Sequence, residues 1–177
     1  MSWKVPRRAN LSTQAILHIL EEEGVDPSLI LEGTGLKRQE ILDAETRISD
    51  TTEILMTERA IALLPQKAGY GLRAGRSMRA TTMGILGLTL LASPTIRAAF
   101  ETMNQFSNLS FLLSKASLKE EGPVNRIVVD MHNLPVSIHR FVFERYYAGS
   151  LIFLREMMPG LDHSIFTLHI PFSDPAY

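Results

Sequence analysis

Hydrophobic residues in the first half of the chain recur at three- and four-residue intervals, a pattern typical of amphipathic helices. We predict a first helix over residues 12–24, with Ser12 as its N-terminal cap and Gly24 at its end. Its inward side chains would be Ile16, Leu17, Ile19 and Leu20. A short second helix begins at Pro27, and residues 37–42 form at most one further short turn.

A longer helix is expected to begin at a cap formed by Ser49 or Asp50 and to end before Pro65. Glu53, three residues after Asp50, would complete a capping box with it. The segment that follows is rich in glycine, and we predict a loop or a frayed helix there. Its glycines are Gly69, Gly71 and Gly75.

Residues 81–92 are apolar on every side, so we expect a fully buried helix at the centre of the domain. Ser93 would cap the next helix, and Pro94 would occupy its first turn, where a backbone N–H has no helical partner in any case. The inward positions of that helix would be Ile96, Ala99, Phe100, Met103 and Phe106.

The second half of the chain changes to shorter aliphatic runs at residues 111–118 and 124–131, with a predicted hairpin loop at 119–123. A long helix over residues 135–158 follows, and residues 164–170 alternate as expected for a third strand. This order predicts an α+β fold, in which a helical N-terminal half precedes a small antiparallel sheet (strand-strand-helix-strand) packed against helices. A parallel sheet would need strand–helix alternation from the start.

The composition limits the partners that this chain can have. Its 177 residues suit one domain with a hydrophobic core, and its formal net charge is -1. A domain that holds DNA unaided normally carries a basic surplus, because phosphate contacts dominate its affinity. Cysteine is absent, which excludes disulfides and thiolate metal sites. Because the sequence shows neither a secretory signal nor an apolar run of ~20 residues, we expect a soluble, cytoplasmic protein.

Sequence motifs of enzymes and metal sites are missing. Gly-x-Ser-x-Gly does not occur, and the glycines up to residue 75 follow no strand, so they make no dinucleotide fingerprint. No two histidines have metal-ligand spacing on one helix; the five are His18, His132, His139, His163 and His169. We therefore predict no enzyme activity, no metal and no cofactor.

Two groups of charged residues are candidates for binding. Arg73, Arg76 and Arg79 precede the apolar helix at three-residue spacing, where free backbone N–H groups favour an anion. The alternative for them is a charged loop with surface ion pairs. Arg140 and Glu144 lie one helical turn apart and can pair, either to fasten the long helix to the sheet or to present a guanidinium to a carboxylate.

Aromatic and methionine side chains either fill the core or shape an adaptable apolar cavity. Two histidines on or beside predicted strands could face such a cavity as polar groups. The candidate ligand-binding residues are Arg73, Arg76, Arg79, Met83, Met103, Phe106, His132, Arg140, Tyr147 and His169. For each of them a purely structural role is the alternative.

Seven short motifs occur in a defined order along the chain. They are Leu-x-Gly-Thr-Gly-Leu at 31–36, Arg-Ile-Ser-Asp at 47–50, Gly-Leu-x-x-Gly at 71–75, Gly-x-x-Gly at 84–87, Ser-Pro-Thr at 93–95, Arg-Phe-x-x-Glu at 140–144 and Pro-Phe-x-Asp-Pro-x-Tyr at 171–177. Together they resemble the N-terminal effector domain of AraC-type bacterial transcription regulators, in the subgroup with an arabinose-binding-like domain. The resemblance runs from residue 31 to residue 177.

The resemblance implies a domain that senses a small molecule and forms homodimers, while a C-terminal pair of helix-turn-helix motifs reads DNA. The chain ends where that reader would begin, so residues 1–177 are expected to form one effector and dimerisation domain without it. Effector binding would control the reader allosterically. The subgroup name does not make arabinose the effector. The alternative is a stand-alone protein that binds a small molecule or a lipid and has no role in transcription.

Overall fold

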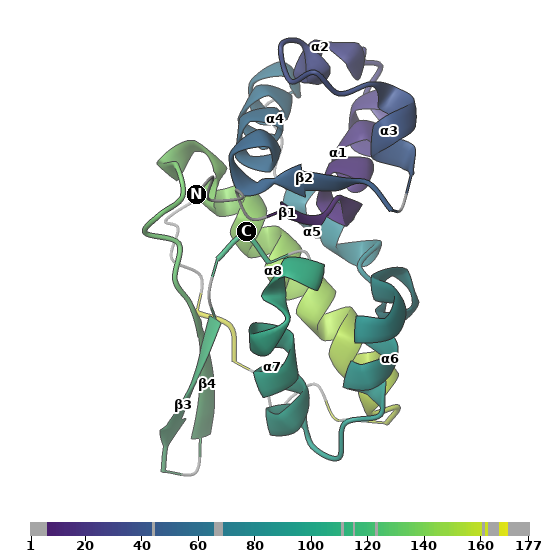
Figure 1. Ribbon diagram of the computed structural model, residues 1–177. Helices are drawn as coiled ribbons and strands as arrows, with labels where there is room; N and C mark the ends of the chain where they lie inside the picture. The colour runs from purple at the N-terminus through teal and green to yellow at the C-terminus, as the bar shows by residue number, and fades with distance from the viewer. Residues whose placement is uncertain are drawn as a thin grey trace, which may run out of the picture.

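The computed structural model describes residues 7–43, 45–65, 69–110, 112–114, 116–122, 124–160, 162 and 167–169. Figure 1 shows a helical body traversed by the long helix α8 (Val136–Met157), with a two-stranded hairpin that projects beside the last helices. The fold is α+β, as predicted. In the described part of the chain, no helix combines the length and the apolar character that a membrane crossing requires.

The first half forms the helices predicted from its periodicity. They are α1 (Leu11–Glu22), α2 (Ser28–Leu31), α3 (Arg38–Leu42) and α4 (Asp50–Leu63). Their apolar faces are buried against one another, with Ile16, Leu20 and Ile30 among the best-covered side chains. The short strands β1 (Arg7–Ala9) and β2 (Arg47–Ser49) pair antiparallel beside these helices and were not predicted.

The N-terminal ends of α1 and α4 are held by different means. Ser12 does not cap α1: it lies buried in the first turn, and Asn10 occupies the cap position. The Asn10 amide donates to the Ile41 carbonyl oxygen at 2.7 Å, which ties α1 to the end of α3. At α4 the Ser49 cap is confirmed, because its hydroxyl oxygen accepts the Thr52 N–H at 3.1 Å.

The glycine-rich segment forms a helix, α5 (Tyr70–Arg76), so the predicted loop or frayed helix is wrong. Its glycines face α8 at very short range. A Cβ on Gly71 would stand 2.2 Å from the Phe141 carbonyl oxygen, and a Cβ on Gly75 would stand 2.4 Å from that of Arg145. Glycine occurs at both positions because only a residue without a side chain lets the two backbones approach so closely.

The apolar segment is divided between a 3-10 turn, η1 (Ala80–Met83), and the helix α6 (Gly84–Leu91). Leu86 is buried, whereas Ile85 is 74% exposed and Leu88 is 57% exposed. The expectation that this segment is buried on every side is therefore wrong. Figure 1 shows why: α6 lies at the edge of the body, with η1 and the next helix as its main contacts.

The next helix, α7 (Ile96–Gln105), begins after Thr95 and not after Ser93. The Thr95 hydroxyl oxygen accepts the Ala98 N–H at 3.1 Å, so the residue after the proline provides the cap. A second 3-10 turn, η2 (Ser107–Leu109), follows directly. The predicted cap is thus displaced by two residues, and Pro94 lies before the helix and not in its first turn, although a new helix does begin shortly after the Ser-Pro pair.

The hairpin consists of β3 (Ala116–Glu121) and β4 (Val124–Val129), paired antiparallel. Its turn is tighter than the predicted loop at 119–123, because the strands pair up to the residues on either side of the turn. Gly122 has a φ of 63°, a conformation that suits glycine in such a turn. Most hairpin side chains are exposed or half-buried, consistent with its projection in Figure 1.

Helix α8 confirms the predicted long helix, which begins after Pro135 and ends before Met158. It packs against α4 and most extensively against α5. Of the predicted third strand, residues 164–166 and 170 lie outside the described residues. Residues 167–169 are in neither a helix nor a strand.

Candidate functional site

A fully buried ion pair lies where α1, α4 and α8 meet. Arg145 on α8 and Glu53 on α4 pair with 3.2 Å between Nη1 and Oε1, and neither side chain is exposed. The guanidinium also donates to the Ser12 hydroxyl on α1. It lies over the rings of Phe141 and Tyr146, at 5.7 Å and 5.2 Å from their centroids. The predicted capping role of Glu53 is wrong, because its carboxylate turns inward to this guanidinium.

A second charged pair fastens α8 to α5. The predicted pairing of Arg140 and Glu144 is confirmed, with 3.1 Å between Nε and Oε1. The other carboxylate oxygen of Glu144 accepts the Gly71 N–H at 3.0 Å, so the pair holds α8 to α5 and not to the sheet. Glu144 is buried, and both of its oxygens have donors within the protein.

Of the three arginines predicted as an anion site, Arg73 already has acidic partners. It lies in the last turn of α5 and pairs with Glu22 and, at 2.6 Å, with Glu23. The hydrogen bond from Arg73 lowers the pKa of the Glu22 carboxyl below its ordinary value. The same bond raises the pKa of Arg73. These contacts join α5 to the end of α1.

Arg79 has a partner on a different helix. Its guanidinium pairs with Glu156, near the end of α8, at 3.2 Å. The second Glu156 oxygen accepts the Ala80 N–H at 2.8 Å, which fixes the start of η1 against α8. Arg76 is exposed at the end of α5. The structure therefore directs Arg73 and Arg79 to separate carboxylates and does not bring them to a common partner.

The two histidines among the candidates are exposed where the structure describes them. His132 pairs with Asp130, and its hydrogen bonds hold the pKa of Asp130 below the ordinary value. His169 is exposed as well. His163 lies outside the described residues. In the described ranges, no three potential metal ligands come together.

The apolar and aromatic candidates differ in burial. Met83 belongs to the hydrophobic core, and Met103 packs against that core from α7. Tyr147 is half-buried on α8. Phe106, predicted to point inward, is 42% exposed at the end of α7, because the helix stops there and the chain turns into η2.

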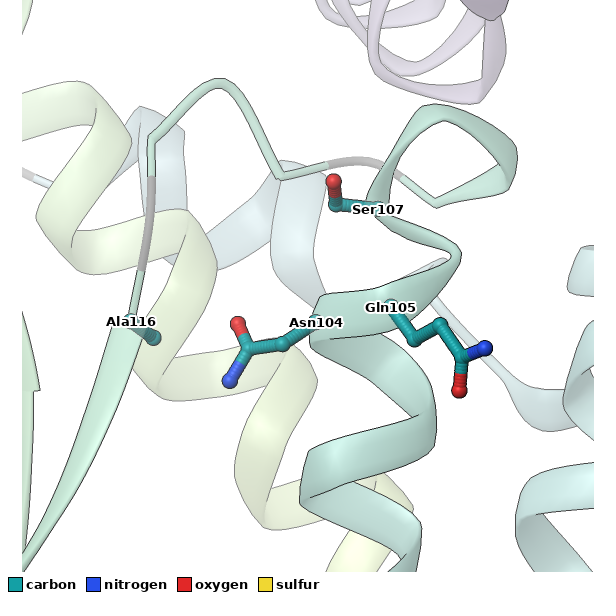
Figure 2. A pocket seen from close by; sticks show the side chains of 4 residues that line it. All are labelled: Asn104, Gln105, Ser107 and Ala116. Atoms are coloured by element: carbon teal, nitrogen blue, oxygen red, sulfur yellow. The ribbon is translucent and has the colours of Figure 1, made fainter.

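Two surface clefts of the described residues flank α7. The first has a volume of about 410 Å³ and lies between the end of α7 and the start of β3 (Figure 2). It is lined by Asn104, Gln105, Ser107 and Ala116. The second has a volume of about 450 Å³ and lies between the start of α7 and the end of α8. It is lined by Ser93, Pro94, Thr95, Ile96, Arg97, Met157 and Met158.

The first cleft offers uncharged polar groups. Figure 2 shows the Asn104 amide pointing toward Ala116, while the Gln105 side chain extends to the other side of α7. The Asn104 amide and the Ser107 hydroxyl can each donate and accept hydrogen bonds. None of the lining residues is charged. The arrangement therefore suits a small neutral molecule that carries hydroxyl or amide groups.

One contact joins the two elements that form this cleft, and another joins the segment before β3 to α8. Arg97, in the first turn of α7, pairs with Glu120 on β3, away from the residues that line the cleft. The Tyr146 hydroxyl on α8 accepts the Ser114 N–H at 3.1 Å, just before β3 begins. The cleft thus lies between a helix of the body and the root of the hairpin. Sequence reasoning did not select Asn104, since a single amide carries no spacing signal.

Comparison with known proteins defines the class of this α+β domain as regulatory. A family model matches residues 24–177, and it is described as "Arabinose-binding domain of AraC transcription regulator, N-term". The chain belongs to this family. The resemblance predicted from the ordered motifs is therefore confirmed.

Two curated relatives are named as transcriptional regulators. The uncharacterized HTH-type transcriptional regulators Mb1430 of Mycobacterium bovis and Rv1395 of Mycobacterium tuberculosis are each 25% identical to the chain over 138 residues. The matched region covers 78% of this chain but only 40% of each relative. No solved structure matches the chain.

Proposed function

We propose that this chain is the effector-sensing and dimerisation domain of a cytoplasmic AraC-type regulator, and that a small molecule bound to it controls a separate DNA reader. The family match carries the proposal. The relatives named as HTH-type regulators extend well beyond the matched region, which leaves room in them for such a reader. A net charge of -1 agrees with DNA contacts being made by another domain. The chain acts by binding and not by catalysis.

The effector site that the geometry favours is the cleft between α7 and β3. Its volume of about 410 Å³ lies within the usual range of ligand sites. Asn104 and Ser107 offer hydrogen bonds to hydroxyl groups, and Ala116 on β3 offers apolar surface. The candidates Met103 and Phe106 are the sequence neighbours of Asn104 and Ser107 but are not among the residues that line the cleft. A sugar or another small polyol has this combination of hydroxyl groups and carbon faces. Arabinose, named in the family description, is one such molecule among many.

The other candidate residues stay predictions. They are Arg73, Arg76, Arg79, Met83, His132, Arg140, Tyr147 and His169. An anionic effector at the arginines would have to compete with Glu23 and Glu156 for the guanidiniums that these carboxylates now hold. The neutral cleft requires no such exchange.

Binding between α7 and β3 would change the relative position of these two elements, because they form different walls of the cleft. A ligand that contacts both walls stabilises the arrangement of α7 and β3 that it binds more tightly. The size of this effect equals the difference between the binding free energies of the ligand for the two arrangements. The Arg97–Glu120 pair joins the same two elements and would respond to the same change. Since α7 also contacts α6, a shift of α7 reaches the edge of the body.

Thermal unfolding with added ligands tests this proposal. L-arabinose, other sugars, polyols and neutral amino acids are added to the wild type, to Asn104→Ala and to the control Asn125→Ala on the exposed strand β4. We expect one class to raise the Tm of the wild type and the control in a dose-dependent way, and to leave Asn104→Ala unchanged. Equal stabilisation of all three would place the site elsewhere. No stabilisation by any compound would contradict effector sensing.

A stand-alone binding protein is the second candidate. The cleft at the start of α7 combines the apolar side chains of Pro94, Ile96, Met157 and Met158 with Arg97, as an acidic lipid would require. Native mass spectrometry of the purified protein would detect a retained lipid. The native reading frame after residue 177 separates the candidates. Helix-turn-helix patterns there favour the regulator, and a stop codon favours the stand-alone protein.

A further inference from the structure

Helix α6 exposes an apolar face without charge. Ile85 is 74% exposed and Leu88 is 57% exposed. Gly84 and Ala92, which fall on the same side by helical spacing, are exposed as well. Residues 80–96 contain no Lys, Arg, Asp, Glu or His. Exposed apolar side chains without charged neighbours on their own helix are a mark of a contact surface.

The opposite face of α6 is already used by the fold. Leu86 and Leu90 are part of the hydrophobic core. Gly87 lies so close to Ala80 that a Cβ there would stand 1.7 Å from the Ala80 carbonyl oxygen. A helix that is apolar on every side is normally buried on every side. Among the described residues, the fold covers one side of α6 and leaves the other for a partner.

We propose that this partner is a second copy of the chain, with α6 packed against α6 of the copy across a two-fold axis. The inference rests on the dimerisation in the proposed function and names its surface. In a two-fold interface each patch meets itself, so a charge on the patch would meet a like charge. The uncharged face of residues 80–96 avoids that repulsion. A DNA-reading domain, which carries a basic surplus, would instead favour an acidic face.

The side chains of the face suit a contact between two helices. Ile85 and Leu88 lie one turn apart, and the smaller Gly84 and Ala92 flank them, which permits a close interaxial approach. Two helix faces alone bury less than the ~800 Å² per partner of a standard interface. Pro94 and Ile96, which follow α6 in the chain and line the cleft at the start of α7, carry no charge and would supply further apolar surface.

Oligomeric state tests the proposal directly. The mass of the wild type, Ile85→Glu, Leu88→Glu and the control Val136→Glu is measured by analytical ultracentrifugation over a range of concentrations. Val136 is 82% exposed on α8, away from the face. We expect the wild type and the control to dimerise, and each α6 variant to raise the dimer dissociation constant at least ~100-fold, because two carboxylates would be buried per interface. Unchanged circular dichroism confirms folding.

A cross-link provides evidence that does not depend on weakening the dimer. The chain has no cysteine, so Leu88→Cys and Val136→Cys each add a single thiol. Under mild oxidation we expect Leu88→Cys to form covalent dimers much faster than Val136→Cys. Equal rates would overturn the proposal, and so would a monomeric wild type. If the protein forms a dimer that the α6 variants do not weaken, the proposed surface is wrong but dimerisation itself stands. The ligand-dependent Tm, which tests effector sensing, is independent of all these outcomes.

Discussion

Removing one member of the buried ion pair between Glu53 and Arg145 should cost much of the stability of the domain. Both side chains are fully buried, and 3.2 Å separates Nη1 from Oε1. Glu53→Gln keeps the shape of the side chain but removes the negative charge that Glu53 places beside the buried guanidinium. Breaking a buried pair in this way costs about 3–5 kcal/mol, against a total stability of ~5–15 kcal/mol for a typical domain. We expect a similar loss for Arg145→Met.

The double variant Glu53→Met/Arg145→Met separates charge from packing. It removes both charges together and fills the space with apolar atoms, so the loss should be at least ~2 kcal/mol smaller than the sum of the losses of the single variants Glu53→Met and Arg145→Met. Arg38→Met serves as the control. Arg38 pairs with Glu21 at 2.6 Å, but it is 51% exposed, so its removal should cost less than ~1 kcal/mol.

Urea unfolding followed by far-ultraviolet circular dichroism gives the free energy of unfolding of each variant. The slope of that free energy with denaturant should stay the same, since the surface exposed on unfolding barely changes. A loss below ~1 kcal/mol for Glu53→Gln would refute the reasoning, because that is the size expected of an exposed pair. Additive losses in the double variant would refute it as well, because they would mean that the two side chains act independently.

Three further changes test other contacts. Gly71→Ala places a methyl group 2.2 Å from the Phe141 carbonyl oxygen, so the free energy of unfolding in urea should fall by about 2 kcal/mol or more. Tyr146→Phe removes the acceptor of the Ser114 N–H, so that amide should exchange its hydrogen several-fold faster by NMR. Ser28, the first residue of α2, donates two hydrogen bonds to Asp26 and lowers its pKa. The ionised carboxylate therefore stabilises the fold at neutral pH, and this stabilisation is lost as the pH falls through the lowered pKa. Asp26→Ala should remove that part of the acid dependence, measured by unfolding between pH ~2 and ~6.

Two of these changes, Gly71→Ala and Asp26→Ala, have a control in the same chain. Gly33→Ala adds a methyl group in open space at a φ of 68°, so it should cost only the ~1 kcal/mol of backbone strain. A Gly71→Ala variant no less stable than this control would contradict the close approach of α5 and α8. Glu101→Ala, on the exposed side of α7, should leave the acid dependence unchanged. If Asp26→Ala also left the acid dependence unchanged, the hydrogen bonds at the start of α2 would not stabilise the carboxylate.

Local patterns predicted most of the helices and the hairpin. Caps and breakers such as Ser49 and Pro135 are short-range signals, and the structure uses them as expected. Helix α5 was missed because glycine usually marks a loop when the sequence is considered alone. Here the glycines are explained by a helix far along the chain, since Gly71 contacts Phe141. Packing between distant segments decided the conformation against local propensity.

The candidate site could be predicted only in part. Met103 and Phe106 were selected because apolar spacing on a helix is visible in the sequence, whereas the Asn104 amide beside them has no periodic signal. The pairing of Arg145 with Glu53 bridges 92 residues, so no local window contains both charges. The absence of charge from α6 was visible in the sequence. Which side of this helix the fold covers could not be predicted, because it depends on the elements against which the helix packs.

The contacts of α8 have a consequence for the synthesis of the protein. Its side chains reach back 133 residues to Ser12, 92 residues to Glu53 and 73 residues to Gly71. The first helices therefore leave the ribosome long before the element that completes their core. Such long-range contacts slow folding and leave apolar surface open to aggregation in the meantime. A chain released before Glu144 and Arg145 are synthesised would lack the side chains that hold the first helices to α8, and would be a substrate for chaperones and proteases.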